Sequence, residues 1–224
     1  MAERRLWKVY ASSFLFLLLF SAGLAWGYSR YTLTRARTFL AELAKLKPGE
    51  STFADAQRLR RAYGGVPTSL LTQNPTCSEE RCELLFTFDN KPLCYLPGVL
   101  QVHLGGDITV KEGRVVESVL LFGRKPNSEF DAGDRRTQEG VIIPPEWEYL
   151  YGVRDVAQRA QEEYGLRKSD PDSHGVPHFV TFRLGPRSTA EDKNRAYSID
   201  LSCLARLRGC DSPSSIYPQG WQNW

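Results

Sequence analysis

The segment VYASSFLFLLLFSAGLAWGY, residues 9–28, contains no formally charged residue and decides the architecture of this chain. Nine of its twenty residues are Leu, Phe or Val, and each favours membrane insertion by roughly 0.3 to 0.6 kcal/mol near the centre of a helix. A helix of this length reaches about 30 Å, the thickness of the hydrocarbon core of a bilayer. We therefore expect a basic N-terminal tail at residues 1–8, a transmembrane anchor at residues 9–28, and a soluble domain after it.

A cleaved signal peptide is the main alternative to a permanent anchor, because it too begins with basic residues and an apolar run. Residues 23–25, Gly-Leu-Ala, offer a small-residue cleavage site before Trp26. The run is longer than a typical signal core of about 7–15 residues, and Trp26 and Tyr28 are typical of aromatic anchors at a membrane interface. A buried helix of a soluble protein is a third interpretation. We favour an uncleaved signal anchor, and a lipoprotein anchor is excluded because no cysteine lies near the end of the run.

Two signals conflict on the side of the membrane that the domain occupies. Basic residues flank both ends of the apolar segment, and a plain count of those that follow it favours a cytoplasmic domain. Large domains translocate regardless of flanking charge, however, and the cysteines are typical of an oxidising compartment. We therefore expect a single-pass protein of the cell membrane with an extracytoplasmic C-terminal domain, periplasmic or extracellular.

The composition is that of an ordinary globular protein with nearly balanced charge. The 224 residues include 29 basic and 26 acidic ones, for a net charge of +3, and 42% are hydrophobic. No block of five or more like charges occurs, so nucleic acid is not an expected partner. The roughly 196 residues after the anchor are enough to form a core without a metal.

All five cysteines lie in the domain, and four of them form two close pairs. Four residues separate Cys77 from Cys82, and six separate Cys203 from Cys210. A disulfide across each short loop contributes about 2 kcal/mol by the chain-entropy model, and we expect both. A zinc site is the alternative, although these spacings differ from the usual C-x2-C knuckle. Cys94 is then a buried apolar residue or, in a thiol redox protein, a reactive one.

Helix signals follow the anchor. Residues 29–50 have a helix-forming composition that ends at a Lys-Pro-Gly sequence, so we assign them to a juxtamembrane helix and linker. The soluble domain comprises residues 51–224. In it, Thr52 and Asp55 form a capping box before an amphipathic helix that ends at Gly64.

The next part of the domain is typical of an antiparallel meander. We expect a hairpin turn at Gly105-Gly106-Asp107 and another at residues 111–113. The strand-like runs lie at residues 82–88, 99–104, 107–110 and 114–122.

A second helix is expected from residue 145 to residue 165, with Val153 and Val156 on its apolar face. Strands at 178–184 and 196–201 follow it. Both expected helices contain Ala-Gln-Arg followed by Tyr-Gly, which indicates a duplicated helix-strand-strand unit with halves at 51–123 and 145–210; chance similarity is the alternative. The predicted fold class is α+β, with an antiparallel sheet packed by two helices.

Residues 46–64, LKPGESTFADAQRLRRAYG, resemble the signature of the SmpA/OmlA family of small outer-membrane assembly lipoproteins. The likeness consists of an apolar residue, a glycine, a Ser or Thr cap and an amphipathic helix that ends in glycine. It implies a small α+β binding module of the cell envelope without enzymatic activity. It covers about a tenth of the chain, the lipid-bearing cysteine of the family is absent, and no functional residue is carried over.

The histidines are the main candidates for catalysis or metal binding. Two of them share a polar loop with two carboxylates, and an acid/base pair there would make the chain an extracytoplasmic hydrolase. The residues of this loop are Asp170, Asp172, His174 and His178. We favour a solvated turn, because glycine and proline in the loop prevent helical spacing of the two rings. His103 is expected in a strand, on the face opposite to its neighbours.

Other catalytic signatures are missing from the sequence. It contains no G-x-S-x-G, no phosphate-binding glycine loop, and no cofactor motif. Its clustered glutamates lie on the expected second helix beside arginines, which favours a solvated face over a glycosidase pair. The glutamates are Glu146, Glu148, Glu162 and Glu163. We expect no catalytic residue, cofactor or metal, and the chain is more consistent with a binding protein than with an enzyme.

The C-terminal tail, residues 211–224, is aromatic. Tyr217, Trp221 and Trp224 are expected either to pack on the domain itself or to contact a partner or the lipid headgroups. The expected function is therefore a membrane-anchored extracytoplasmic binding or scaffold protein of the bacterial cell envelope. Its partners would be the bilayer, through residues 9–28, and a protein of the envelope; the hydrolase is the alternative.

Overall fold

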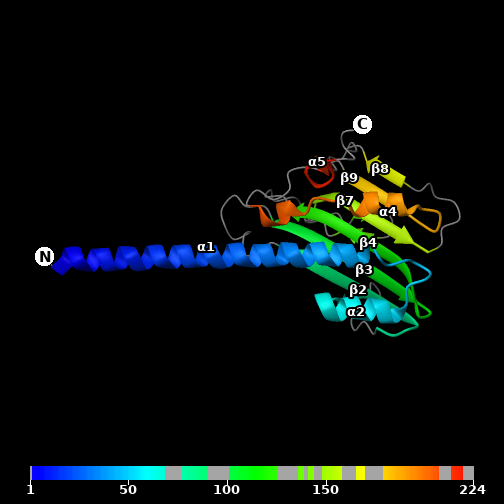
Figure 1. Ribbon diagram of the computed structural model, residues 1–224, viewed down its shortest axis with the longest axis horizontal. Helices are drawn as coiled ribbons and strands as arrows, with labels where there is room; N and C mark the ends of the chain where they lie inside the picture. Colours follow the sequence, from blue (N-terminus) through cyan, green and yellow to red (C-terminus); the bar gives the residue numbers. More distant parts are fainter. Residues whose placement is uncertain are drawn as a thin grey trace.

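The computed structural model shows an α+β domain from which one long helix projects (Figure 1). The structure describes residues 2–68, 77–89, 101–125, 136–138, 141–143, 148–157, 165–169, 179–206 and 213–218. The helices are α1 (Ala2–Leu43), α2 (Phe53–Tyr63), α4 (Ala190–Tyr197), α5 (Pro213–Ile216) and the 3-10 helix η1 (Ser202–Ala205). The strands are β1 (Val66–Pro67), β2 (Arg81–Asp89), β3 (Gln101–Lys111), β4 (Arg114–Lys125), β5 (Arg136–Gln138), β6 (Val141–Ile143), β7 (Glu148–Val156), β8 (Gly165–Ser169) and β9 (Phe179–Leu184).

Helix α1 is unbroken over 42 residues, and its two halves have different surroundings. The N-terminal half stands clear of the domain (Figure 1) and exposes its apolar side chains, with Phe16 67% exposed. It is long and apolar enough to span a membrane. The C-terminal half lies against the domain and is buried along one face from Ser29 onward, because Leu33, Ala36 and Leu43 recur at helical spacing. The expected anchor and juxtamembrane helix are thus one rod.

The main sheet has seven strands in the order β1-β2-β3-β4-β7-β9-β8. Neighbouring strands are antiparallel except β7 and β9, which run parallel. The prediction of a wholly antiparallel sheet is therefore wrong at one pair. The chain leaves β7, forms β8 at the edge of the sheet, and returns as β9 between them, which fixes the parallel direction. Strands β5 and β6 form a separate two-stranded sheet.

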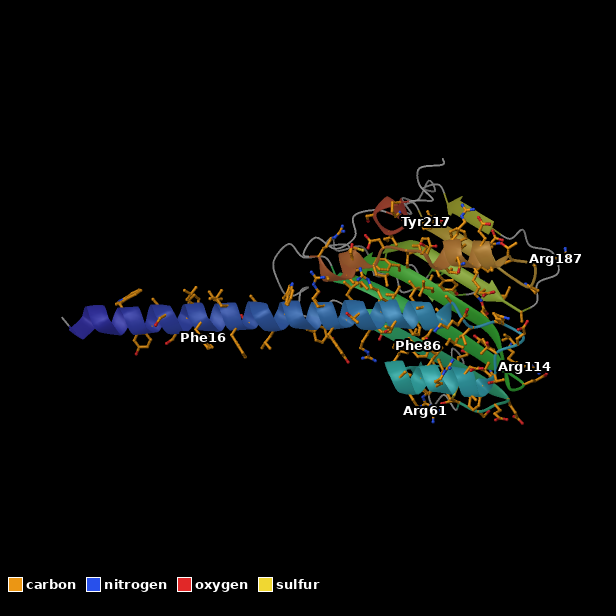
Figure 2. The ribbon with its side chains drawn as sticks, viewed as in Figure 1. Phe16, Arg61, Phe86, Arg114, Arg187 and Tyr217 are labelled. Carbon is orange, nitrogen blue, oxygen red and sulfur yellow. A yellow bond between two sulfur atoms is a disulfide. The ribbon has the colours of Figure 1, made fainter. Side chains whose placement is uncertain are left out.

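The core lies between the sheet and the helices α1 and α2, with Phe39 at its centre. The ring centroid of Phe39 lies 4.8 Å from that of Phe86, 5.0 Å from that of Phe88 and 5.3 Å from that of Tyr63. Gly106 in β3 makes room for this ring, because a Cβ atom there would lie 2.5 Å from it. Figure 2 shows Phe86 in the domain and Phe16 on the projecting half of α1.

The predicted hairpin turn at residues 105–107 is wrong, because these residues continue β3 without a break. Gly106 does not bend the chain. Its missing side chain allows β3 and α1 to approach closely. Residues 111–113 do form the predicted turn, between β3 and β4. Helix α2 also has the predicted bounds and the predicted capping box of Thr52 and Asp55.

The predicted second helix is wrong where the structure describes it, since residues 148–156 form β7. Tyr151 and Val153 alternate toward the core, so the true period is two residues, and the spacing of Val153 and Val156 is incidental. The predicted strand at 196–201 is also wrong. It overlaps the end of α4, a helix that begins at a capping box of Thr189 and Asp192. Sheet packing therefore comes from α1, α2 and α4, and the duplication stays a prediction.

An ion pair between a partly exposed lysine and a buried aspartate joins α4 to the sheet. Lys193 Nζ lies 2.8 Å from Asp155 Oδ2 in β7, and it also donates to the carbonyl oxygen of Leu46, just after α1. Burial of the Asp155 carboxyl raises its pKa, and the hydrogen bond and charge of Lys193 oppose that rise. Three separate parts of the chain are thus held together near the end of α1.

Candidate functional site

A pocket of about 610 Å³ lies at the end of the sheet far from the projecting half of α1. The β3–β4 hairpin, the end of β7 and the chain after α1 form it, and we call it the distal pocket. Its lining residues are Gly49, Lys111, Glu112, Arg114, Val116, Glu117, Arg154, Val156 and Ala157. Figure 2 shows Arg114 at this end of the domain.

The rim of the distal pocket is a tight turn held in place by backbone hydrogen bonds. Glu112 and Gly113 have positive φ values of 51° and 74°, as a two-residue hairpin turn requires. Their amides donate to the carbonyl oxygens of Glu80 and Glu79, at 3.0 and 2.7 Å. The carbonyl oxygen of Gly113 accepts from the amide of Phe53 at 2.8 Å. The rim is therefore fixed from two sides, by the loop before β2 and by the start of α2.

A disulfide closes the loop that supports this rim. Cys77 and Cys82 are bonded, with their Cα atoms 4.3 Å apart. The carbonyl groups of Glu79 and Glu80, which accept from the rim, lie inside this closed loop. The predicted disulfide between Cys77 and Cys82 is thus present, and it supports the rim of the distal pocket.

Two cations stand at the mouth of the distal pocket. Arg114 Nη1 donates to the carbonyl oxygens of Gly49 and Glu50, at 3.4 and 3.2 Å. Lys111 is exposed. Within the described part of the chain neither cation forms an ion pair with a carboxylate. Their charges are therefore accessible to an anionic ligand, and together they exceed the single exposed carboxylate among the described residues at the mouth, that of Glu112.

The inner wall combines an ion pair with apolar side chains. The guanidinium group of Arg154 in β7 donates to the carboxylate of Glu117 in β4, and both side chains are mostly buried. Three apolar residues line the pocket beside this ion pair: Val116, Val156 and Ala157. The amide of Ala157 donates to the carbonyl oxygen of Val116 at 2.8 Å, which continues the β4–β7 pairing into the pocket.

A buried carboxyl group lies beside the site on the same face of the sheet. Burial of Asp107 in β3, with the nearby carboxylates of Glu83 and Glu117, raises its pKa to about 6. Its Oδ1 atom is buried and has no hydrogen-bond partner among the described residues. Near neutral pH the native state therefore carries an unfavourable buried charge at Asp107.

A histidine–carboxylate pair lies at the opposite end of the sheet. His103 Nδ1 is 2.5 Å from Asp89 Oδ1, and both side chains are mostly buried. His103 is on the predicted face, away from the buried Val102 and Leu104. This geometry orients the imidazole ring, which is one part of general-base catalysis; a hydrolase also needs a nucleophile in reach of that ring. The sequence predicted no catalytic residue and offered the loop at residues 170–178 as the alternative site. It missed the pair of Asp89 and His103, because no local motif joins residues 89 and 103.

The other predicted site residues have different outcomes. Cys203 is disulfide-bonded, and its predicted partner Cys210 lies outside the described residues. Tyr217 is 2% exposed and packs against Tyr151 and Phe182, with ring centroids 5.5 and 5.4 Å away, so its ring belongs to the core. The remaining predicted residues also lie outside the described part of the chain: Cys94, Asp170, Asp172, His174, His178, Trp221 and Trp224.

Among the described residues, no group of three or more His, Cys, Asp or Glu side chains is arranged to hold a metal ion. Comparison of the chain with known proteins finds no matching family model, no similar curated protein and no similar solved structure. The likeness of residues 46–64 to the SmpA/OmlA family thus stays a local resemblance.

Proposed function

We propose that this chain is a membrane-anchored, extracytoplasmic binding protein of the bacterial cell envelope, which presents its distal pocket to an acidic segment of a partner protein. The observation that carries the proposal is the division of α1. One half of this unbroken helix exposes apolar side chains, and the other half supplies Phe39 and Leu43 to the core of the domain.

Aromatic residues support a bilayer as the surroundings of the exposed half. Trp7 and Tyr10 are exposed near its start, and Trp26 and Tyr28 are exposed near its end. The eighteen helical steps from Tyr10 to Tyr28 rise about 27 Å, close to the thickness of a hydrocarbon core. Tryptophan and tyrosine are enriched at both interfaces of a bilayer, so this spacing fits a spanning helix.

The disulfides support the extracytoplasmic side. Cys77 and Cys82 are bonded to each other, and Cys203 is also disulfide-bonded. Structural disulfides persist in the periplasm and outside the cell, and they are rare in a reducing cytosol. The bond between Cys77 and Cys82 also supports the pocket rim, so an oxidising compartment would favour the binding-competent state.

The position of the distal pocket supports a partner in the aqueous phase. Helix α1 rises about 1.5 Å per residue, so Leu43 lies roughly 22 Å beyond Tyr28. The pocket is at the same end of the domain as Leu43, since the amide of Gly49 donates to the carbonyl oxygen of Val115 at 2.7 Å. A partner held there stands clear of the headgroups.

The lining of the distal pocket supports an acidic partner. Lys111 and Arg114 offer accessible positive charge at the mouth, while Val116 and Val156 offer apolar surface within. A carboxylate at the mouth and an apolar side chain inside would satisfy both. Arginine binds carboxylates through two parallel hydrogen bonds, which gives orientation as well as attraction.

Site-specific photo-crosslinking in intact cells tests the proposal. A photoreactive amino acid at Lys111 is compared with the same amino acid at Arg187, which is exposed at the same end of the domain (Figure 2) without lining the pocket. We expect a defined protein adduct from position 111 alone, and its loss in the variant Arg114→Glu. Identical products at both positions, or an adduct that Arg114→Glu leaves unchanged, would contradict the proposal.

A further inference from the structure

Two arginines of α1 point back along the helix, toward its exposed apolar half. The guanidinium carbon of Arg30 lies 5.5 Å from the ring centroid of Trp26, and that of Arg35 lies 5.6 Å from the ring centroid of Tyr31. Long helical side chains point toward the N-terminus of their helix. If residues 9–28 span the bilayer, this direction is toward the lipid headgroups.

The heights of these groups match the headgroup layer. That layer is roughly 5 to 8 Å thick on each side of the hydrocarbon core. Along α1, Arg30 lies about 3 Å beyond Tyr28, and Arg35 lies about 10 Å beyond it. Since the Arg35 side chain reaches back to Tyr31, both guanidinium groups lie within or just above the headgroups.

The domain packs against this part of α1 through the 3-10 helix η1 and adds one further cation after it. Arg35 Nη2 donates to the carbonyl oxygen of Ala62 at 3.3 Å, which ties the end of α2 to this part of α1. Arg206, after η1, lies 3.7 Å from Asp200, and Arg37 interacts electrostatically with the same carboxylate. We call this group of four residues the arginine collar: Arg30, Arg35, Arg37 and Arg206. With Asp200 as the carboxylate placed among them in the described structure, the collar has an excess of positive charge.

We propose that the arginine collar binds the phosphate groups of anionic phospholipids. Planar guanidinium groups bind phosphate through paired hydrogen bonds. A ring of cations at the end of a membrane-spanning helix attracts anionic headgroups over a distance of about a Debye length. This inference rests on the proposed membrane anchoring and adds a lipid class to it. Bound headgroups would fix the rotation of the domain about α1, and so the direction in which the distal pocket faces.

Native mass spectrometry of the full-length protein tests this inference. The protein is equilibrated in mixed micelles that contain phosphatidylcholine and phosphatidylglycerol in equal amounts, and the lipids retained on it are counted. We expect phosphatidylglycerol to exceed phosphatidylcholine, with each collar arginine near the headgroups accounting for about fivefold of the preference. The variant Arg30→Gln with Arg35→Gln should lose most of it, and Arg30→Lys with Arg35→Lys should keep most of it.

The matched control is Arg187→Gln, which removes the same charge at the distal end of the domain and should leave the preference unchanged. Arg30→Gln alone, at an exposed position, repeats the measurement if the double variant misfolds. Retention of both lipids in the bulk ratio overturns the inference of phospholipid binding by the collar and leaves the proposed membrane anchoring intact. An equal loss in Arg187→Gln, or displacement of phosphatidylglycerol by excess glycerol 3-phosphate, also overturns it. Retention of neither lipid overturns the membrane anchoring as well.

Discussion

Replacing Phe39 with alanine removes the residue through which α1 is built into the domain. The Phe39 side chain is fully buried, and its ring contacts those of Tyr63, Phe86 and Phe88. Truncating a buried phenylalanine to alanine costs about 3 to 5 kcal/mol of unfolding free energy. We expect the upper part of this range, because three aromatic contacts are lost together and the neighbouring strands limit collapse of the cavity.

The assay is urea unfolding of the full-length protein in mild detergent, followed by near-ultraviolet circular dichroism, which reports on packed aromatic rings. The matched control is Phe16→Ala on the same helix, at a position that is 67% exposed. We expect the control to change the unfolding free energy of the domain by less than about 0.5 kcal/mol. A cost below about 1 kcal/mol for Phe39→Ala, or equal costs for both variants, would refute the assignment of α1 to the core.

Three further perturbations follow from the same contacts. Burial raises the native pKa of the Asp107 carboxyl to about 6. The protonated form of this group therefore contributes its full share of the folding stability below about pH 4, and this share is lost as the pH rises through about 6. Asp107→Asn should therefore stabilise the protein at pH 7.5 by up to about 3 kcal/mol and have little effect at pH 4, as measured by thermal unfolding; a gain independent of pH would contradict this. Gly106→Val should destabilise the domain by at least about 2 kcal/mol in the same assay, because it places a side chain where an α1 ring lies; an unchanged melting temperature would be inconsistent with that packing. Replacing Cys77 and Cys82 with serine should lower the free energy of unfolding by about 2 kcal/mol and speed amide hydrogen exchange at residues 112–113. Unchanged exchange at these residues would show that the disulfide does not support the pocket rim.

Local signals in the sequence predicted the elements whose ends are chemically marked. The capping box of Thr52 and Asp55 and the glycine at position 64 fixed both ends of α2. The turn at residues 111–113 marked the β3–β4 hairpin in the same way. A similar box at Thr189 and Asp192 was present before α4 and went unrecognised.

The errors came where tertiary contacts override local pattern. Gly106 has the composition of a turn, yet it lies within a strand because Phe39 of a distant helix occupies the space above it. Val153 and Val156 have helical spacing, yet they lie in β7, which fills the place between β4 and β9. Neither contact has a signature in the neighbouring sequence.

The distal pocket could not be predicted from the sequence for the same reason. Its residues come from three places in the chain, around positions 49, 111–117 and 154–157. The pairing of Glu117 with Arg154 depends on the register between β4 and β7, and register cannot be read from either strand alone. The Cys77–Cys82 pair was predictable, but its support of the pocket rim follows only from the hydrogen bonds of Glu112 and Gly113.

Hydrogen–deuterium exchange of the full-length protein in liposomes tests most directly whether α1 is one rod shared by the bilayer and the domain. We expect slow exchange without interruption along residues 10–43, because lipid protects the first half and the core protects the second. A rapidly exchanging stretch between residues 28 and 33 would reveal a hinge, and rapid exchange along residues 10–28 would show that the helix lies outside the bilayer. Either result would contradict the account.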